Sequence, residues 1–209
     1  MRITVFGASG ASGQQLVEQA LAAGHRVTAV VRDPAKLPAR VPSGGLDVVR
    51  ADVMDPDAIA PAVAGSDVVI SALGPRPKAT EPVCAPGAES IVAAMRASGA
   101  RRLVVIAASG YIDDPADGFL TGSIAKPIVR RLLRRPFADM ARADEIVSGS
   151  GLDWTIMRPP RLTNGKRKTY RTVVDRTVGS TLSRADLAAA TLAAAGDPAT
   201  IGHAIGVGY

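Results

Sequence analysis

The stretch that decides the fold is GASGASG, Gly7 to Gly13, within the opening segment MRITVFGASGASGQQLVEQAL. It follows the apolar run RITVF and precedes a segment with apolar residues at helical spacing. Glycine permits backbone angles closed to other residues, and missing side chains let a ligand approach the amides at a helix N-terminus. A strand, a glycine loop and a helix in this order are typical of a site for a dinucleotide pyrophosphate, and the alternative is a tight turn without a ligand. We therefore predict pyrophosphate contacts from Gly7, Ala8, Ser9, Gly10, Ala11, Ser12 and Gly13.

Apolar runs and amphipathic segments alternate along the whole chain. We expect strands at 2–7, 25–32, 46–53, 66–74, 101–109, 152–160 and 203–209. We expect helices at 13–24, 55–65, 83–99 and 183–196, and helical segments across 125–148. Asp55 stands at the N-cap of one of these helices, and Ser183 and Asp186 form a capping pair in another.

The strands are nearly continuous in valine and isoleucine, which is typical of parallel strands buried on both faces. The chain is therefore expected to form a single α/β domain, residues 1–209. Its core would be a doubly wound, Rossmann-like parallel sheet with helices on both faces. Residues 110–182 are less regular, and we expect them to be insertions at the carboxyl edge of the sheet, where such folds bind ligands.

The composition and charge of the chain limit the kinds of molecule that it is expected to bind. The 209 residues carry a net charge of +6, and only 3% are aromatic. Basic residues gather in IVRRLLRRP, 128–136, where the arginines would share sides of one helix with Leu132 and Leu133 turned elsewhere, and in NGKRKTYR, 164–171. Both segments fit a solvated surface, and an anion-binding role stays open. Because no nucleic-acid motif accompanies the charge, we expect no nucleic-acid partner.

No apolar run approaches the roughly 20 residues that a membrane-spanning helix needs. We therefore expect no membrane partner and a cytoplasmic location. We also expect a monomer or a small homo-oligomer. Cys84 is the single cysteine of the sequence and is interpreted as structural, and no spacing predicts a metal site.

The end of the second strand indicates which dinucleotide binds. A carboxylate there would accept hydrogen bonds from an adenosine ribose, whereas a guanidinium pairs with a 2′-phosphate. The sequence AVVRD places Arg32 at this point, so NADP(H) is favoured over NAD(H). Asp33 is the competing carboxylate, unless it caps the turn that begins at Pro34.

The GxxGxxG spacing of Gly7, Gly10 and Gly13 resembles that of the extended and atypical short-chain dehydrogenases/reductases. Further segments resemble the NAD(P)H-binding, NmrA-like branch of that superfamily, and within it the flavin reductases, also called biliverdin-IX-beta reductases. These segments are VVRDPAKLP at 30–38, ADV at 51–53, SALG at 71–74, SIVAAM at 90–95, AASGY at 107–111 and SGLDWTIMRPP at 150–160.

The resemblance implies roles for residues near the ends of the predicted strands. Asp52 and Val53 would flank the adenine. Ser109 would lie beside the nicotinamide, and the backbone of Pro159 would approach its carboxamide. The segment that would line the middle of the cofactor consists of Ala72, Leu73 and Gly74.

The candidate catalytic residues are Ser109 and Tyr111, and the candidates for binding the acceptor are Tyr111 and Arg161. Arg161 stands where the family commonly has histidine, which leaves the acceptor open. Each role has an alternative: Asp52 capping a turn, Ser109 ending a strand with a local hydrogen bond, and Tyr111 packing in the core.

Alcohol-oxidising members of the superfamily use a Tyr-x-x-x-Lys pair, and this chain has Pro136 and Met140 where that pair should lie. An electrophilic ring system needs no such proton donor. The sequence therefore predicts an NADPH-dependent reductase that passes hydride to a flavin, a quinone or a similar conjugated acceptor, with flavin as a transient substrate. The alternative is a non-catalytic NADP(H) sensor like the NmrA-like regulators.

Overall fold

The computed structural model describes residues 1–37, 44–75, 81–114 and 126–209, and its centre is an eight-stranded sheet. The order of the strands is β3-β2-β1-β4-β5-β6-β10-β8. These strands are β1 (Arg2–Phe6), β2 (Arg26–Val31), β3 (Leu46–Arg50), β4 (Val68–Ser71), β5 (Arg102–Ile106), β6 (Asp153–Arg158), β8 (Arg171–Val174) and β10 (His203–Gly208). All neighbours pair in parallel except β8, which runs antiparallel to β10.

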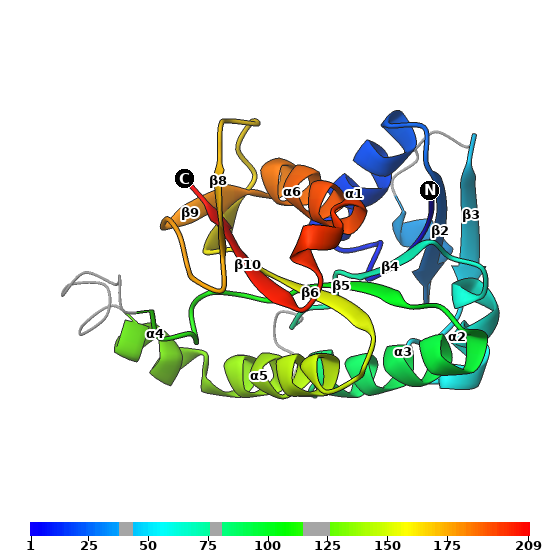
Figure 1. Ribbon diagram of the computed structural model, residues 1–209, viewed down its shortest axis with the longest axis horizontal. Helices are drawn as coiled ribbons and strands as arrows, with labels where there is room; N and C mark the ends of the chain where they lie inside the picture. The colour runs from blue at the N-terminus through cyan, green and yellow to red at the C-terminus, as the bar shows by residue number, and fades with distance from the viewer. Residues whose placement is uncertain (38–43, 76–80, 115–125) are drawn as a thin grey trace.

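Helices cover both faces of the sheet, as predicted for a doubly wound α/β fold. The helices are α1 (Ala11–Ala22), α2 (Pro56–Val63), α3 (Cys84–Ser98), α4 (Lys126–Leu132), α5 (Arg134–Ser148) and α6 (Arg184–Gly196), with 3-10 turns η1 (Pro34–Lys36) and η3 (Pro198–Thr200). Helices α1 and α6 lie on one face, and α2, α3 and α5 lie on the other (Figure 1). Each face has its own core, built around Leu16 and Leu187 on the first and around Ile91 and Val147 on the second.

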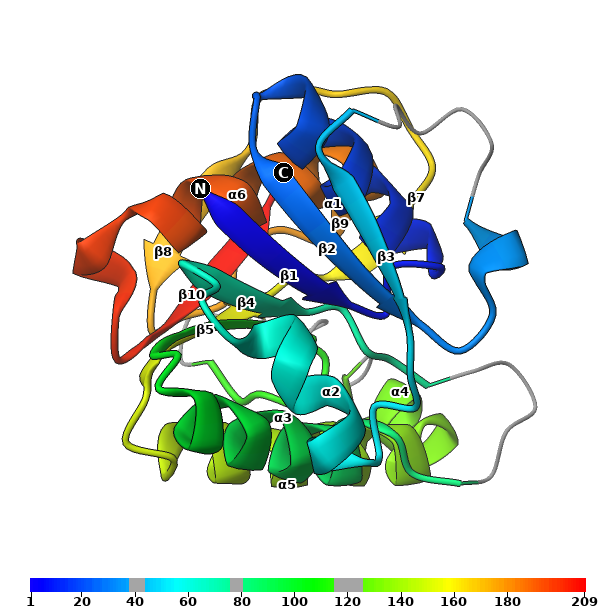
Figure 2. The same ribbon diagram turned by 90° about the vertical axis from the view of Figure 1, so that its right-hand side faces the viewer.

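The strand order places the site. The chain runs outward from β1 to β2 and β3, then returns to β4 on the other side of β1 and continues outward. The crevice between the carboxyl ends of β1 and β4 is therefore the switch point where such sheets bind ligands. Figure 2 shows β1, β2 and β3 side by side and pointing the same way, so their following loops meet at one edge.

Two glycines let the first loop reach this crevice. Gly7 has φ +72°, and a Cβ on it would lie 2.6 Å from the backbone oxygen of Ala72, just after β4. A Cβ on Gly13, in the first turn of α1, would overlap the carbonyl oxygen of Gly7. The loop thus folds tightly against β4, and the helix packs tightly against the loop, which only glycine allows at these two positions.

Three short strands lie in the region predicted to be insertions, and the sequence pattern does not reveal them. They are β7 (Arg161–Thr163), its parallel partner β9 (Thr181–Ser183), and β8. The predicted parallel sheet is confirmed, and β8 adds an antiparallel strand at its edge that was not foreseen. Residues 115–125, which belong to the same region, lie outside the described part of the chain.

The arginine-rich segment 128–136 does not form one helix. The chain breaks at Leu133, so Arg130 belongs to α4 and Arg134 to α5, and the prediction that they share a helix side is wrong. Both Leu132 and Leu133 are exposed. No helix among the described residues is both long and apolar enough to cross a membrane.

Alanine substitutions at Gly7 and Gly24 distinguish the cost of a positive φ from the cost of an overlap between a Cβ and a neighbouring backbone. Gly24 also has positive φ, at +77°, but a Cβ there would meet no atom within 4 Å. We expect Gly24→Ala to lower the free energy of unfolding by about 1 kcal/mol. Gly7→Ala should cost about 1–3 kcal/mol more, because its methyl group displaces the backbone at Ala72. Urea denaturation of both variants measures the difference, and equal losses would contradict the close approach.

Candidate functional site

A cleft of about 580 Å³ opens at the switch point. It lies at the carboxyl ends of β1, β2, β3 and β4 and brings together predicted cofactor residues from four separate loops. Those residues are Gly7, Ser9, Gly10, Arg32, Asp52, Val53, Ala72, Leu73 and Gly74. The cleft is therefore the candidate dinucleotide site.

The other residues of the glycine loop do not line the cleft. Ala8 and Gly13 are buried, so their part is to pack the loop against its neighbours. Ala11 is exposed and Ser12 is half-buried in the first turn of α1. Contacts of these residues with a ligand stay predictions.

Helix α1 begins differently from three other helices. The N-termini of α2 and α6 are capped by the side chains of Asp55 and Ser183. The carboxylate of Asp139, from α5, accepts hydrogen bonds from the three backbone amides of residues 83–85 at the start of α3. At α1, the N-cap Gly10 supplies no side-chain hydrogen bond, and the first turn holds no acidic residue. The first amides of α1 and its positive dipole end are left for an anion beside the cleft.

The side chains at the end of β2 are better suited to binding a 2′-phosphate than to binding the hydroxyl groups of an adenosine ribose. Arg32 is exposed and lines the cleft. Asp33 is already engaged, because its Oδ1 accepts a hydrogen bond from the amide of Ala35 at 3.1 Å and caps η1. The competing carboxylate thus has the local role that the sequence left open.

Asp52 also makes a local contact at the rim of the cleft. Its Oδ1 accepts a hydrogen bond from the amide of Met54 at 3.1 Å, which fixes the turn after β3. Asp52 therefore caps this turn and also lines the cleft, and its contact with the adenine stays a prediction.

Sequence reasoning missed part of the cleft lining. The missed residues are Val30, Val31, Ala51, Met54, Glu81, Pro82, Val83 and Pro86. Most of them follow a strand or precede α3, so the rule that loops at the carboxyl edge bind ligands could have found them. Among them, Glu81 is the titratable residue.

The residues predicted to lie near the nicotinamide form a second group, outside the lining of the cleft. The amide of Ser109 donates a hydrogen bond to the carbonyl oxygen of Pro159 at 2.9 Å, which joins the segments that follow β5 and β6. Ser109 is buried. Arg161 is exposed at the start of β7. The structure therefore brings Ser109 and Pro159 together, and the roles of all three residues stay predictions.

Tyr111 takes part in a buried polar network. Its hydroxyl donates a hydrogen bond to Oδ2 of Asp144 at 2.7 Å, and Arg158 lies 3.3 Å from the same oxygen. The ring of Tyr111 also packs against Phe137, with centroids 5.5 Å apart. Burial, with the neighbouring Asp144 carboxylate second, raises the pKa of the Tyr111 phenol above its usual range. The phenol is thus a protonated donor held by Asp144, which fits the packing role that the sequence left open.

Burial also raises the pKa of Asp144, although the hydrogen bond from Tyr111 and the charge of Arg158 oppose it. The second oxygen, Oδ1, has no hydrogen-bond partner among the described residues. Sequence reasoning missed Asp144 and Arg158, because the network joins residues from three separate elements.

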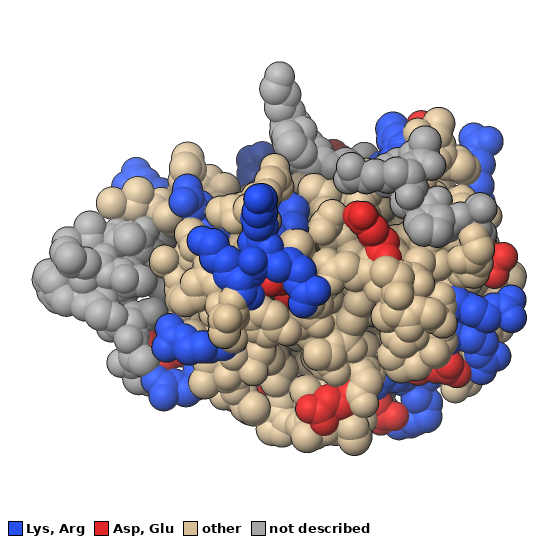
Figure 3. All heavy atoms as spheres, turned by 90° about the horizontal axis from the view of Figure 1, so that it is seen from above, with Lys and Arg blue, Asp and Glu red and all other residues tan. Residues whose placement is uncertain are grey.

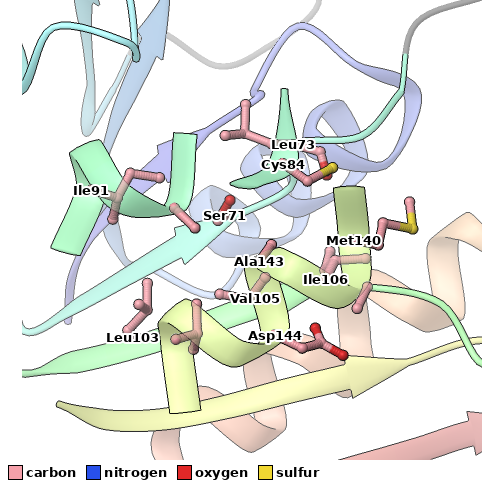
Figure 4. A pocket seen from close by; sticks show the side chains of 13 residues that line it. Ser71, Leu73, Cys84, Ile91, Leu103, Val105, Ile106, Met140, Ala143 and Asp144 are labelled. Carbon is pink, nitrogen blue, oxygen red and sulfur yellow. The ribbon is translucent and has the colours of Figure 1, made fainter. Parts of the chain in front are cut away.

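A small cavity of about 10 Å³ lies between the sheet and helices α3 and α5 (Figure 4). It has room for about one water molecule and is too small for a cofactor. Cys84 lines it, and burial followed by the nearby Asp139 carboxylate raises the pKa of its thiol to about 12. The thiol is therefore protonated at neutral pH, in agreement with its structural interpretation.

The helix that would carry a Tyr-x-x-x-Lys pair is α5. Pro136 lies in its first turn, and Met140 lines the small cavity one turn later. Neither side chain can exchange a proton. The tyrosine nearest to this helix, Tyr111, contacts a carboxylate rather than a lysine.

The second basic segment forms a loop between β7 and β8. This loop rises on the side of α1 and α6, where Lys and Arg side chains gather in the middle of the face (Figure 3). The buried carboxylate of Asp186 holds this loop in place, because it accepts a hydrogen bond from the backbone amide of Lys168. The same carboxylate accepts hydrogen bonds from the hydroxyl groups of Ser183 and Tyr209. Burial acts to raise the pKa of Asp186, but these hydrogen bonds outweigh it and hold the pKa below its usual value.

The chain belongs to the NAD(P)H-binding family, whose sequence model matches residues 7–198. An uncharacterised chloroplast protein of Arabidopsis thaliana is 32% identical over 179 residues, or 78% of this chain and 60% of that protein. A 3-diazoavenalumate denitrifying reductase of a Streptomyces species is 37% identical over 116 residues, or 50% of this chain and 36% of that protein. The chain thus spans less than two thirds of the length of these curated relatives.

Solved structures share the fold at low sequence identity. A wide-type short-chain dehydrogenase/reductase of Veillonella parvula, solved with NADP, has a TM-score of 0.82 and 21% identity, covering 100% of this chain and 94% of that one. A Rossmann-fold NAD(P)-binding family protein of Shigella flexneri has a TM-score of 0.77 and 24% identity, covering 99% and 92%. These likenesses confirm the predicted fold. Membership in the NAD(P)H-binding family agrees with the predicted dinucleotide ligand.

The raised pKa of Asp144 predicts a pH dependence of stability. The folded state keeps the proton of Asp144 at a pH where the unfolded state has lost it, so protonation favours folding. We expect the stability of the wild type, relative to Asp144→Asn, to rise as the pH falls from 7 towards 4. Urea denaturation of both proteins at several pH values measures this.

Asp67→Asn is the control with the opposite sign. Hydrogen bonds from the backbone and side chain of Arg2 lower the pKa of Asp67, so its stabilisation is lost as the pH falls. The raised pKa of Asp144 would be contradicted if the free energy of unfolding of the wild type, relative to that of Asp144→Asn, stayed constant or fell on acidification.

Proposed function

We propose that this protein is an NADPH-dependent reductase that transfers hydride to a flavin, a quinone or a similar conjugated acceptor. The observation that carries the proposal is the 580 Å³ cleft, which gathers nine predicted cofactor residues at the switch point of the sheet. Membership in the NAD(P)H-binding family supports the same ligand.

The residues in the cleft fit a dinucleotide phosphate. The open amides at the start of α1 would hold the pyrophosphate, because they lack both a capping side chain and a nearby acidic residue. Arg32 would pair with the 2′-phosphate through charge-assisted hydrogen bonds. Asp33 does not compete for the ribose with its Oδ1, which caps η1. These features favour NADPH over NADH.

When bound, NADPH supplies the hydride. The segments after β5 and β6 would orient the reacting ring, since the hydrogen bond between Ser109 and Pro159 fixes them to each other. No acid or base stands at positions 136 and 140 of α5. An acceptor that is already electrophilic suits this site, because water can supply the proton that follows the hydride.

The named relatives are consistent with the proposal. One of them is a reductase by name, although it matches half of this chain. One structural neighbour was solved with NADP.

Arg32→Ala should remove the preference for NADPH. The wild type should bind NADPH more tightly than NADH by about 1.5–3 kcal/mol, the value of a hydrogen bond to a charged group. Titration calorimetry with both cofactors measures the difference. Arg26→Ala is a matched control, because Arg26 is an exposed arginine at the opposite end of the same strand, and it should leave the preference intact. Equal affinity of the wild type for the two cofactors would contradict the assignment.

Turnover separates a reductase from an NADP(H) sensor. Absorbance at 340 nm should fall when NADPH and the protein are mixed with flavin mononucleotide or a quinone, and secondary alcohols with NADP⁺ should give no useful rate. Ser109→Ala should lower kcat about tenfold, or about 1.4 kcal/mol, because it removes a hydroxyl that would orient the nicotinamide while keeping the backbone hydrogen bond to Pro159. Tight binding of NADPH without oxidation across flavins, quinones and bilins would favour the sensor.

A further inference from the structure

Exposed large apolar side chains concentrate at one place on the molecule. Of nine such residues among the described parts of the chain, four lie within 128–133, in and directly after α4. They are Ile128, Val129, Leu132 and Leu133, with Leu132 81% exposed and Ile128 64% exposed. Helix α4 lies at one end of the molecule, beside the start of α5 (Figure 1). A concentration of apolar surface in so short a segment marks an interaction site.

The apolar and basic side chains occupy different sides of this short helix. At 100° per residue, residues 128, 132 and 129 span an arc of about 100°, and Arg130 and Arg131 fall outside it. Leu133 follows directly after the end of the helix. Arg130 forms an ion pair with Asp113 at 2.8 Å and donates a hydrogen bond to the carbonyl oxygen of Gly110. Its position fixes α4 to the segment that follows β5.

Three arginines beside the apolar arc are exposed. Arg131, Arg134 and Arg135 are exposed and make no ion pair within the described part of the chain. Together with Leu132, they line a groove of about 790 Å³ between this segment and the start of α3. The groove also contains the carboxylates of Glu81 and Asp139, of which Asp139 is bound to the amides at the start of α3. The surface therefore joins an apolar arc to a groove in which arginines outnumber carboxylates.

We propose that residues 128–135 bind the surface of a membrane that contains anionic lipids. Ile128, Val129, Leu132 and Leu133 enter the boundary between headgroups and acyl chains. Arg131, Arg134 and Arg135 contact lipid phosphates. An apolar side flanked by cations is the pattern of a helix that lies in the interface. The segment lies on the membrane and does not cross it, because α4 has only seven residues.

Charge favours a lipid surface over a second copy of the chain. A two-fold contact through this surface would bring the three arginines of both copies into one interface, since such a contact pairs identical patches. An anionic membrane instead presents phosphates to all three arginines. The net charge of +6 adds a general attraction to such a surface. This differs from the sequence-based expectation of no membrane partner, which took the arginines as solvated and did not foresee the exposed leucines.

Sedimentation with lipid vesicles tests the proposal. Purified protein is mixed with vesicles of phosphatidylcholine alone, or of phosphatidylcholine and phosphatidylglycerol at about 3:1. We expect the bound fraction to be several-fold higher on the anionic vesicles and to fall in 0.5 M salt, where electrostatic attraction is screened.

Two matched variants distinguish binding through this surface from nonspecific binding to vesicles. Leu132→Asp should lower binding to anionic vesicles at least fivefold, and Val174→Asp should not. Val174 is an apolar residue that is 53% exposed on the edge strand β8. Arg131→Gln with Arg135→Gln should lower binding to anionic vesicles and leave binding to neutral ones unchanged. Retained NADPH binding shows that each variant is folded.

Three results would overturn the proposal. One is equal sedimentation with anionic and neutral vesicles. Another is equal loss of binding in Leu132→Asp and Val174→Asp, which would mean that no particular surface is used. The third is a dimer in solution that Leu132→Asp dissociates, with no binding to vesicles, which would assign this surface to a second copy of the chain.

Discussion

The close approach between the first loop and the end of β4 is the constraint on which the rest of the site depends. The loop can cross the sheet edge at this depth because Gly7 has positive φ and no Cβ against the carbonyl of Ala72. The first turn of α1 can follow it because Gly13 has no Cβ against Gly7. The N-terminus of α1 is thereby held at the switch point, with its amides at the crevice that opens between β1 and β4.

The chemistry of the site follows from which polar groups are already engaged. Carboxylates and hydroxyls of the protein satisfy the starts of α2, α3 and α6, whereas the start of α1 is left open. Asp33 is used in a turn and Tyr111 is used in a buried network, while Arg32 remains exposed in the cleft. The groups that remain available can hold phosphates and orient a ring, and they offer little for acid-base chemistry.

The sequence was sufficient for the main sheet and for half of the site. Long apolar runs predict the seven parallel strands, and glycine spacing predicts the loop, because both signals are local. The short strands β7, β8 and β9 carry little periodicity, and β8 is half polar, with three of its four residues exposed. The break at Leu133 has no glycine or proline directly at it to announce it. The link between Tyr111 and Asp144 joins residues 33 positions apart, which no local pattern reveals.

The most direct test of the account is a crystal structure of the protein with NADP⁺ bound. The account predicts that the pyrophosphate lies against the amides at the start of α1 and that the 2′-phosphate contacts Arg32. It also predicts that the nicotinamide reaches the segments joined by Ser109 and Pro159. A dinucleotide bound elsewhere on the molecule, or a 2′-phosphate that points away from Arg32 into solvent, would contradict the account.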